Sequence, residues 1–165
     1  MRSRLALPQL DSLTQAQRTI YESVLDTRGN VSGPFLAWLH SPGLADPAEK
    51  MGAFCRYRTG LSVMEVEQLI LLVAAHHRCT GEQQIHEPIA IQAGLSSEQV
   101  ELIRQGALPL LEEPRLVLLA ALVRQLLLAN RINDEPFATP WPKDAGRSRR
   151  RHRPLLVRGP HAQGL

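Results

Sequence analysis

The stretch from Ser62 to Ala75 constrains the fold more than any other part of this sequence. Ser62 and Glu65 have the spacing of a helix-capping box, and a largely apolar stretch without Gly or Pro follows them. This pattern predicts a helix that runs to about His77 and is apolar on nearly every side. Such a helix lies at the centre of a domain or in a subunit interface. Other helices of the chain or a second subunit must therefore cover it.

Helix start and stop signals predict these other helices. Asp11 or Ser12 is the expected cap of the first, Asp46-Pro47 opens another, and Glu113-Pro114 opens the last. With 27 Leu against seven aromatic residues and no strand-like alternation, the chain is expected to be all-α. The expected helical segments are 13–27, 35–40, 47–59, 62–77, 80–93, 96–105 and 114–133.

Several protein classes are excluded at this stage. Two cysteines 24 residues apart, Cys55 and Cys79, do not supply the framework of a disulfide-rich secreted domain. The first 13 residues lack the apolar core of a signal peptide, and the longest apolar run, 69–75, is too short to cross a bilayer. We therefore expect a cytoplasmic protein without a membrane partner.

The charge of the chain is unevenly distributed. Residues 1–135 contain 12 Lys and Arg against 15 Asp and Glu, whereas residues 136–165 contain 7 against 1. The terminal segment is rich in Pro and Arg and shows no apolar periodicity, so we expect residues 136–165 to be a disordered basic tail. A nucleic-acid partner is not expected, because no aromatic residues interleave with the arginines and the body is mildly acidic. The predicted organisation is an N-terminal helix and connection in 1–32, a helical domain in 33–135, and the tail.

Four residues are the strongest candidates for a catalytic site. Cys79, Glu82 and His86 have offsets that place them on one side of one helix, and Glu67 lies twelve residues before Cys79 on the apolar helix. A buried carboxylate needs a partner. If the two helices form an antiparallel hairpin, Glu67 comes within reach of His86, where it would fix the tautomer of an imidazole suited to acid/base chemistry.

Simpler interpretations of the same residues stay open. Glu82 and His86 have the spacing of an ordinary surface pair on a helix, and Cys79, like Cys55, has the character of a small buried hydrophobe. A zinc site built from Cys, His and Glu has enough ligands but no identifiable second shell, so no metal is expected.

The order of features along the chain adds a further interpretation. It rests on four stretches, which are Gly33-Pro34-Phe35 through Leu61, Glu65 to Ala75, Cys79 to Pro88, and Ala93 to Ser96. With these stretches the sequence, over about residues 30–133, resembles the carboxymuconolactone decarboxylase-like family, which shares its fold with the AhpD-type alkylhydroperoxidases. The resemblance implies an all-α fold built on a helical hairpin and assembled as a homotrimer or homohexamer, with the site near subunit contacts.

The peroxidase branch of this fold matches the chain only in part. In that branch a glutamate precedes the pattern C-x2-C-x3-H, and Glu67, Cys79 and His86 match the glutamate, the first cysteine and the histidine. Glu82 stands where the second cysteine would be. A carboxylate forms neither a sulfenic acid nor a disulfide, so the two-cysteine peroxidase cycle is not available.

The decarboxylase branch is the better match, and it implies a cofactor-free carboxy-lyase of aromatic compound catabolism. His86 would donate or accept the proton, with Glu67 and Glu82 orienting it and Cys79 in the pocket. The expected anchors for an anionic substrate are Arg56, Arg58 and Arg78.

Two alternatives accompany this interpretation. One is an antioxidant thiol peroxidase of the peroxiredoxin type that uses Cys79, with Cys55 as a resolving thiol only if the two Cα atoms lie within ~7 Å. The other is a non-catalytic helical interaction module.

The chain departs from the family pattern after the last predicted helix. Family members usually continue with another helix where this chain has its basic tail, and loss of that helix would uncover apolar surface.

Overall fold

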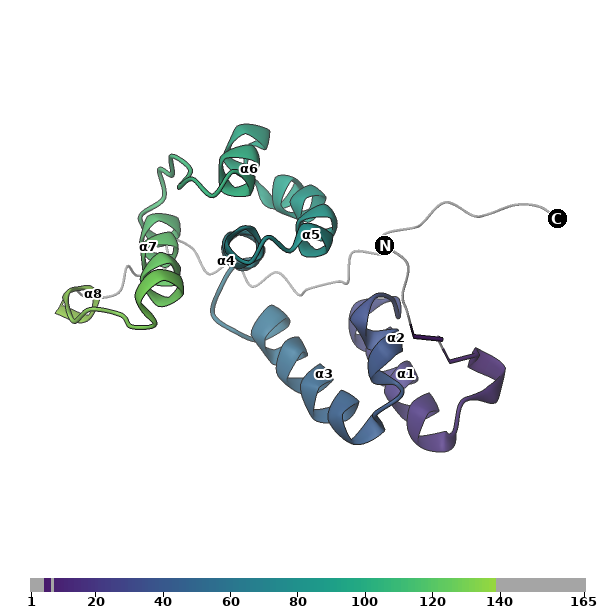
Figure 1. Cartoon of the computed structure of the whole chain (residues 1–165). Helices are drawn as coiled ribbons and strands as arrows, with labels where there is room; N and C mark the ends of the chain where they lie inside the picture. The colour runs from purple at the N-terminus through teal and green to yellow at the C-terminus, as the bar shows by residue number, and fades with distance from the viewer. Residues whose placement is uncertain (1–4, 7, 139–165) are drawn as a thin grey trace. The chain divides into compact units, whose positions relative to one another are not determined.

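A computed structural model describes residues 5–6 and 8–138 of the chain. Every regular element in that part is a helix, which confirms the predicted all-α class (Figure 1). No described helix has both the length and the apolar character needed to cross a membrane. The elements are a 3-10 turn at Leu10–Ser12 followed by α1 (Gln15–Arg28), α2 (Pro34–Trp38), α3 (Pro42–Tyr57), α4 (Val63–His76), α5 (Thr80–Ala93), α6 (Ser97–Arg104), α7 (Pro114–Ala129) and α8 (Glu135–Ala138).

The helices belong to two compact units. The first unit ends at Thr59 and holds α1 to α3, and the second begins at Gly60 and holds α4 to α8. The boundary expected between residues 32 and 33 falls inside the first unit. The candidate residues Glu67, Cys79, Glu82 and His86 all belong to the second.

In the first unit, α1 and α2 both pack on α3. The predicted caps of α1, Asp11 and Ser12, are wrong. The hydroxyl of Thr14 accepts a hydrogen bond from the backbone of Gln17, and the Gln17 side chain accepts one from the Thr14 backbone. The Gln17 amide also donates to the carbonyl of Leu39, so a tertiary contact favours the helix start at this cap.

The predicted start of α3 at Pro47 is also wrong, because the helix begins at Pro42 and continues through Pro47. Pro42 occupies the first turn, where a missing N–H costs nothing. At Pro47 one internal hydrogen bond is lost, but the preceding turn buries Ala45 against Leu39 in the core of this unit. Packing of that turn outweighs the local signal for a start at Pro47.

In the second unit, α4 is the central helix. Figure 1 shows it nearly end-on, with α5 to its right, α6 above it and α7 to its left, in agreement with its contacts to all three. Leu71 of α4 is 1% exposed and belongs to the core with four residues of the following segments, which are Ala90, Leu95, Val100 and Ile103. This helix, which is apolar on nearly every side, therefore lies at the centre of its unit, one of the two positions predicted for it.

The sequence signals in the second unit are confirmed closely. Capping boxes form at Ser62 with Glu65 and at Ser96 with Gln99, and α7 begins at Pro114. The expected disordered tail, 136–165, is corrected at its start, because α8 continues to Ala138. The remainder of that prediction lies outside the described residues.

Candidate functional site

Glu67 and His86 meet across the hairpin of α4 and α5. His86 Nδ1 lies 2.7 Å from Glu67 Oε2, which confirms the predicted proximity. Glu67 is 1% exposed and His86 9% exposed, so the contact is buried. An ionised carboxylate only accepts hydrogen bonds, so in that state Nδ1 carries the hydrogen and donates it. This leaves Nε2 as the ring nitrogen that faces the rest of the site.

Glu82 lies on the other side of the imidazole. Its Oε2 is 3.2 Å from His86 Nε2, and its side chain is 44% exposed. Glu82 precedes His86 by one turn of α5, so the helix itself brings the two together. The ring therefore bridges one buried carboxylate that is fixed by packing and one carboxylate at the surface that can reach water.

Cys79 is placed at the N-cap of α5, where it is an exposed free thiol. The prediction of a small buried hydrophobe is wrong for this residue. Cys55 is also an exposed free thiol, but it belongs to α3 in the first unit. The interpretation of Cys55 as buried is wrong as well, because it lies on the outer side of α3 and the core side of that helix is taken by Ala45, Glu49 and Ala53.

The three predicted anchor arginines are not brought to one place within a single unit. Arg56, near the end of α3, lies 5.8 Å from the ring of Tyr57, and Arg58 is the exposed C-cap of that helix. Both belong to the first unit. Arg78 lies in the connection between α4 and α5 and lines a groove of the second unit that none of Glu67, Glu82 and His86 lines.

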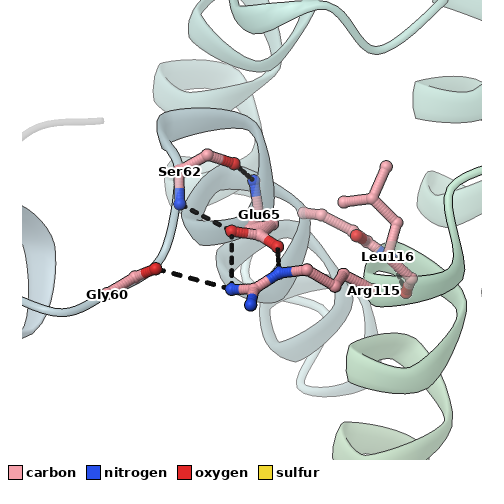
Figure 2. Close-up of polar contacts among 6 residues, drawn as sticks. Gly60, Ser62, Glu65, Arg115 and Leu116 are labelled. Carbon is pink, nitrogen blue, oxygen red and sulfur yellow. Dashed lines mark hydrogen bonds and ion pairs between the residues drawn. The ribbon is translucent and has the colours of Figure 1, made fainter. Parts of the chain in front are cut away.

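A second polar cluster fixes the start of α4, where Arg115, a residue that the sequence did not single out, joins the predicted capping box. Figure 2 shows Arg115 of α7 against Glu65, with its Nε 2.6 Å from Oε1 and its Nη2 3.4 Å from the carbonyl oxygen of Gly60. Glu65 Oε2 also accepts a hydrogen bond of 2.6 Å from the backbone of Ser62. The carboxylate thus caps α4 and ties it to α7. Its capping role was visible in the sequence, but no local signal connects positions 65 and 115.

The charge state of Glu65 reflects these contacts. Burial acts to raise its pKa, but hydrogen bonds from Arg115 and Ser62, together with the positive charge of Arg115, outweigh burial and hold the pKa below its ordinary value. Gln68, one turn further along α4, adds a buried hydrogen bond of 3.1 Å from its side-chain amide to the carbonyl oxygen of Leu116.

The two clusters occupy different faces of α4. Glu65 and Gln68 are three residues apart and both contact α7, whereas Glu67 contacts α5. The contacts to α7 therefore fix the rotation of α4 about its axis. That rotation directs Glu67 at His86, so Arg115 supports the acid/base pair through the orientation of α4.

Across the described residues, no three His, Cys, Asp or Glu side chains are grouped as ligands of one metal ion. The two nitrogens of His86 point at different carboxylates, an arrangement suited to moving a proton through the ring. No family model, curated protein or solved structure matches this chain.

Proposed function

We propose that this protein is a cofactor-independent acid/base enzyme in which His86 Nε2 transfers the proton. The observation that carries the proposal is the buried contact of 2.7 Å between Glu67 and His86 Nδ1. A carboxylate behind an imidazole fixes its tautomer and stabilises its protonated form, which are the two properties that a general acid/base needs near neutral pH. Glu67 acts as the positioning residue.

Glu82 completes the proton path. Its carboxylate lies within 3.2 Å of Nε2 and is half exposed, so it can return a proton from water to the ring after each turnover. It can also swing away from Nε2 when an anionic substrate enters, because its side chain is not enclosed.

The resemblance to the carboxymuconolactone decarboxylase-like family supports a small carboxylated lactone or a related acid as substrate. The C–C bond to the departing carboxylate breaks, and its electron pair passes into the unsaturated system conjugated with the lactone carbonyl. The proton from His86 Nε2 then goes to a ring carbon, and CO2 leaves.

The test is turnover of carboxymuconolactone, measured as the release of CO2. We expect His86→Ala to lower kcat by about 10²- to 10⁴-fold, the usual contribution of a general acid/base. His77→Ala removes an exposed histidine at the end of α4 and serves as the matched control. Activity that is unaffected by His86→Ala, or absent from the wild type, overturns the decarboxylase proposal.

The positioning role of Glu67 has its own readout. Glu67→Gln removes the charge behind the ring, so the pH at which kcat is half-maximal should shift while KM changes little. Glu67→Asp should restore part of the wild-type profile. A profile that keeps its midpoint in Glu67→Gln contradicts this role.

A thiol peroxidase is the second candidate, and the exposure of Cys79 at the N-terminal end of α5 favours it. The thiolate would attack the peroxide oxygen and become a sulfenic acid, the alcohol would leave, and an external dithiol would reduce the sulfenic acid. Hydroperoxide consumption with a dithiol should then vanish in Cys79→Ser and persist in Cys55→Ser. Absence of turnover with both substrate classes would favour the non-catalytic interaction module.

A further inference from the structure

A groove of about 370 Å³ lies in the second unit, away from the acid/base site. It is formed by the end of α4, the end of α6 with the loop that follows it, and the second half of α7. Its floor is aliphatic, and no Phe, Tyr or Trp lines it. The floor residues are Leu72, Ala75, Ile103, Val123 and Leu127.

The charged residues that line this groove are all of one sign. Arg78, Arg104 and Arg124 line it together with His76, and no acidic side chain does. This is a local reversal of charge, because residues 1–135 as a whole are mildly acidic. An aliphatic floor with a cationic rim matches a ligand that has an apolar body and a negative end.

Two of these arginines have no partner among the described residues. Arg104 is committed to Glu87, with Nε 2.8 Å from Oε1, and to Glu101, with Nη1 2.7 Å from Oε2. Arg78 and Arg124 are exposed, and neither makes a side-chain hydrogen bond or ion pair within that part of the chain. Their guanidinium groups are therefore available to an incoming anion.

The backbone of Arg78 is an independent observation. Arg78 has φ 53° in the turn that ends α4, and two hydrogen bonds close this turn, from Cys79 to the carbonyl of Ala74 and from Arg78 to that of Ala75. This is the Schellman arrangement, in which Gly is preferred because other residues are strained in the left-handed conformation. Arg78 therefore occupies a position where glycine would be less strained, and its side chain lines the groove.

We propose that the groove binds an amphipathic carboxylate of the medium-chain fatty acid type. The aliphatic chain lies on the floor between α4 and α7, and the carboxylate is held by Arg78 and Arg124. The volume falls within the range of about 300–1,000 Å³ that small-molecule sites occupy. Guanidinium groups suit this ligand because they bind a carboxylate through two parallel hydrogen bonds.

The experiment is calorimetric titration of the full-length protein with decanoate. We expect saturable binding with one ligand per chain. Arg78→Gly should weaken it by about tenfold, the equivalent of one charge-assisted hydrogen bond, while its Tm stays equal to or above that of the wild type. Because glycine relieves the strained turn, a loss of binding in this variant is not a consequence of unfolding. Arg124→Gln, on the exposed face of α7, should give a similar loss.

Three controls distinguish the source of binding. Decan-1-ol has the same chain without the charge and should bind at least about tenfold more weakly. A variant with Arg149→Gln, Arg150→Gln and Arg151→Gln removes three of the seven positive charges of residues 136–165 and should bind decanoate as the wild type does. His86→Ala should also bind normally, so the groove and the proposed acid/base function are tested separately. Undetectable decanoate binding, equal affinity in Arg78→Gly, or binding lost with the terminal arginines overturns the proposal.

Discussion

Replacement of Arg115 by Met should destabilise the second unit by about 3 kcal/mol, because it leaves the carboxylate of Glu65 buried without its countercharge. The side chains of Glu65 and Arg115 are only 7% and 16% exposed, and their closest atoms are 2.6 Å apart. Removing one partner of a buried ion pair costs about 3–5 kcal/mol. The lower end applies here, because Glu65 keeps its hydrogen bond from the Ser62 backbone.

A double-mutant cycle separates the pair from the packing of the Arg115 side chain. Glu65→Gln should cost about 1–2 kcal/mol, because glutamine also serves in a capping box but carries no charge. The loss of stability in the double variant should be smaller than the sum of the losses in the two single variants by about 1.5–2 kcal/mol, since no unpaired charge is then buried. Arg124→Met on the same helix removes an exposed arginine and should change stability by less than about 0.5 kcal/mol.

Hydrogen exchange of the α4 amides in a urea series is the appropriate assay. Trp38, Tyr21 and Tyr57 belong to the first unit and Trp141 lies outside the described residues, so amide exchange is the more direct probe of α4. Exchange of α4 amides measures the opening free energy of the helix that Glu65 caps. An Arg115→Met effect no larger than that of Arg124→Met, or strictly additive single variants, would refute the reasoning.

Three other perturbations test the same structure. Since the pKa of Glu65 is lowered on folding, the contribution of this carboxylate to stability is complete above the unfolded pKa of about 4.3 and is lost as pH falls through the folded pKa. Amide exchange of α4 followed against decreasing pH should show this loss of stability in the wild type and less of it in Glu65→Gln. Arg78→Gly should stabilise the second unit by about 0.5–1 kcal/mol in urea unfolding, because glycine relieves the left-handed backbone. Gly94→Ala should destabilise it by about 1–2 kcal/mol, because Gly94 has φ 123° and a Cβ there would lie 3.1 Å from Met64 Sδ. Stability changes of the opposite sign would contradict the assignment of strain to these two turns. Leu71→Ala should cost about 2–5 kcal/mol in the same assay, since a side chain that is 1% exposed leaves a cavity, and a loss below about 1 kcal/mol would mean that α4 is not the centre of the core.

Local signals were most successful where a helix end has a self-contained cap. The boxes at Ser62 and Ser96 involve residues three positions apart, so the sequence displays both partners together. The start of α3 was mispredicted because Ala45 packs with Leu39 in the core of the first unit, a contact that neighbouring residues do not reveal. The start of α1 was mispredicted although Thr14 and Gln17 form a capping box of the same local type, because Asp11 and Ser12 are also good cap residues.

The candidate site divides in the same way. Helical spacing puts Glu82 one turn from His86, and an antiparallel hairpin brings Glu67 close, so these three were predicted together. Arg115 lies fifty residues from Glu65, and no periodicity connects them. The same holds for Arg104 and Arg124, which meet Arg78 only around the groove.

The sequence by itself determined the helical class, the central position of α4 and the meeting of Glu67 with His86, because each follows from hydrophobic periodicity and from a short connection between neighbouring helices. Only the tertiary structure decided which face of α4 meets α7, how Arg115 pairs with the buried Glu65, and that unpartnered cations surround an aliphatic groove. These features join helices separated by long stretches of chain. Their pairing is set by how whole helix surfaces fit together, which no local pattern of residues encodes.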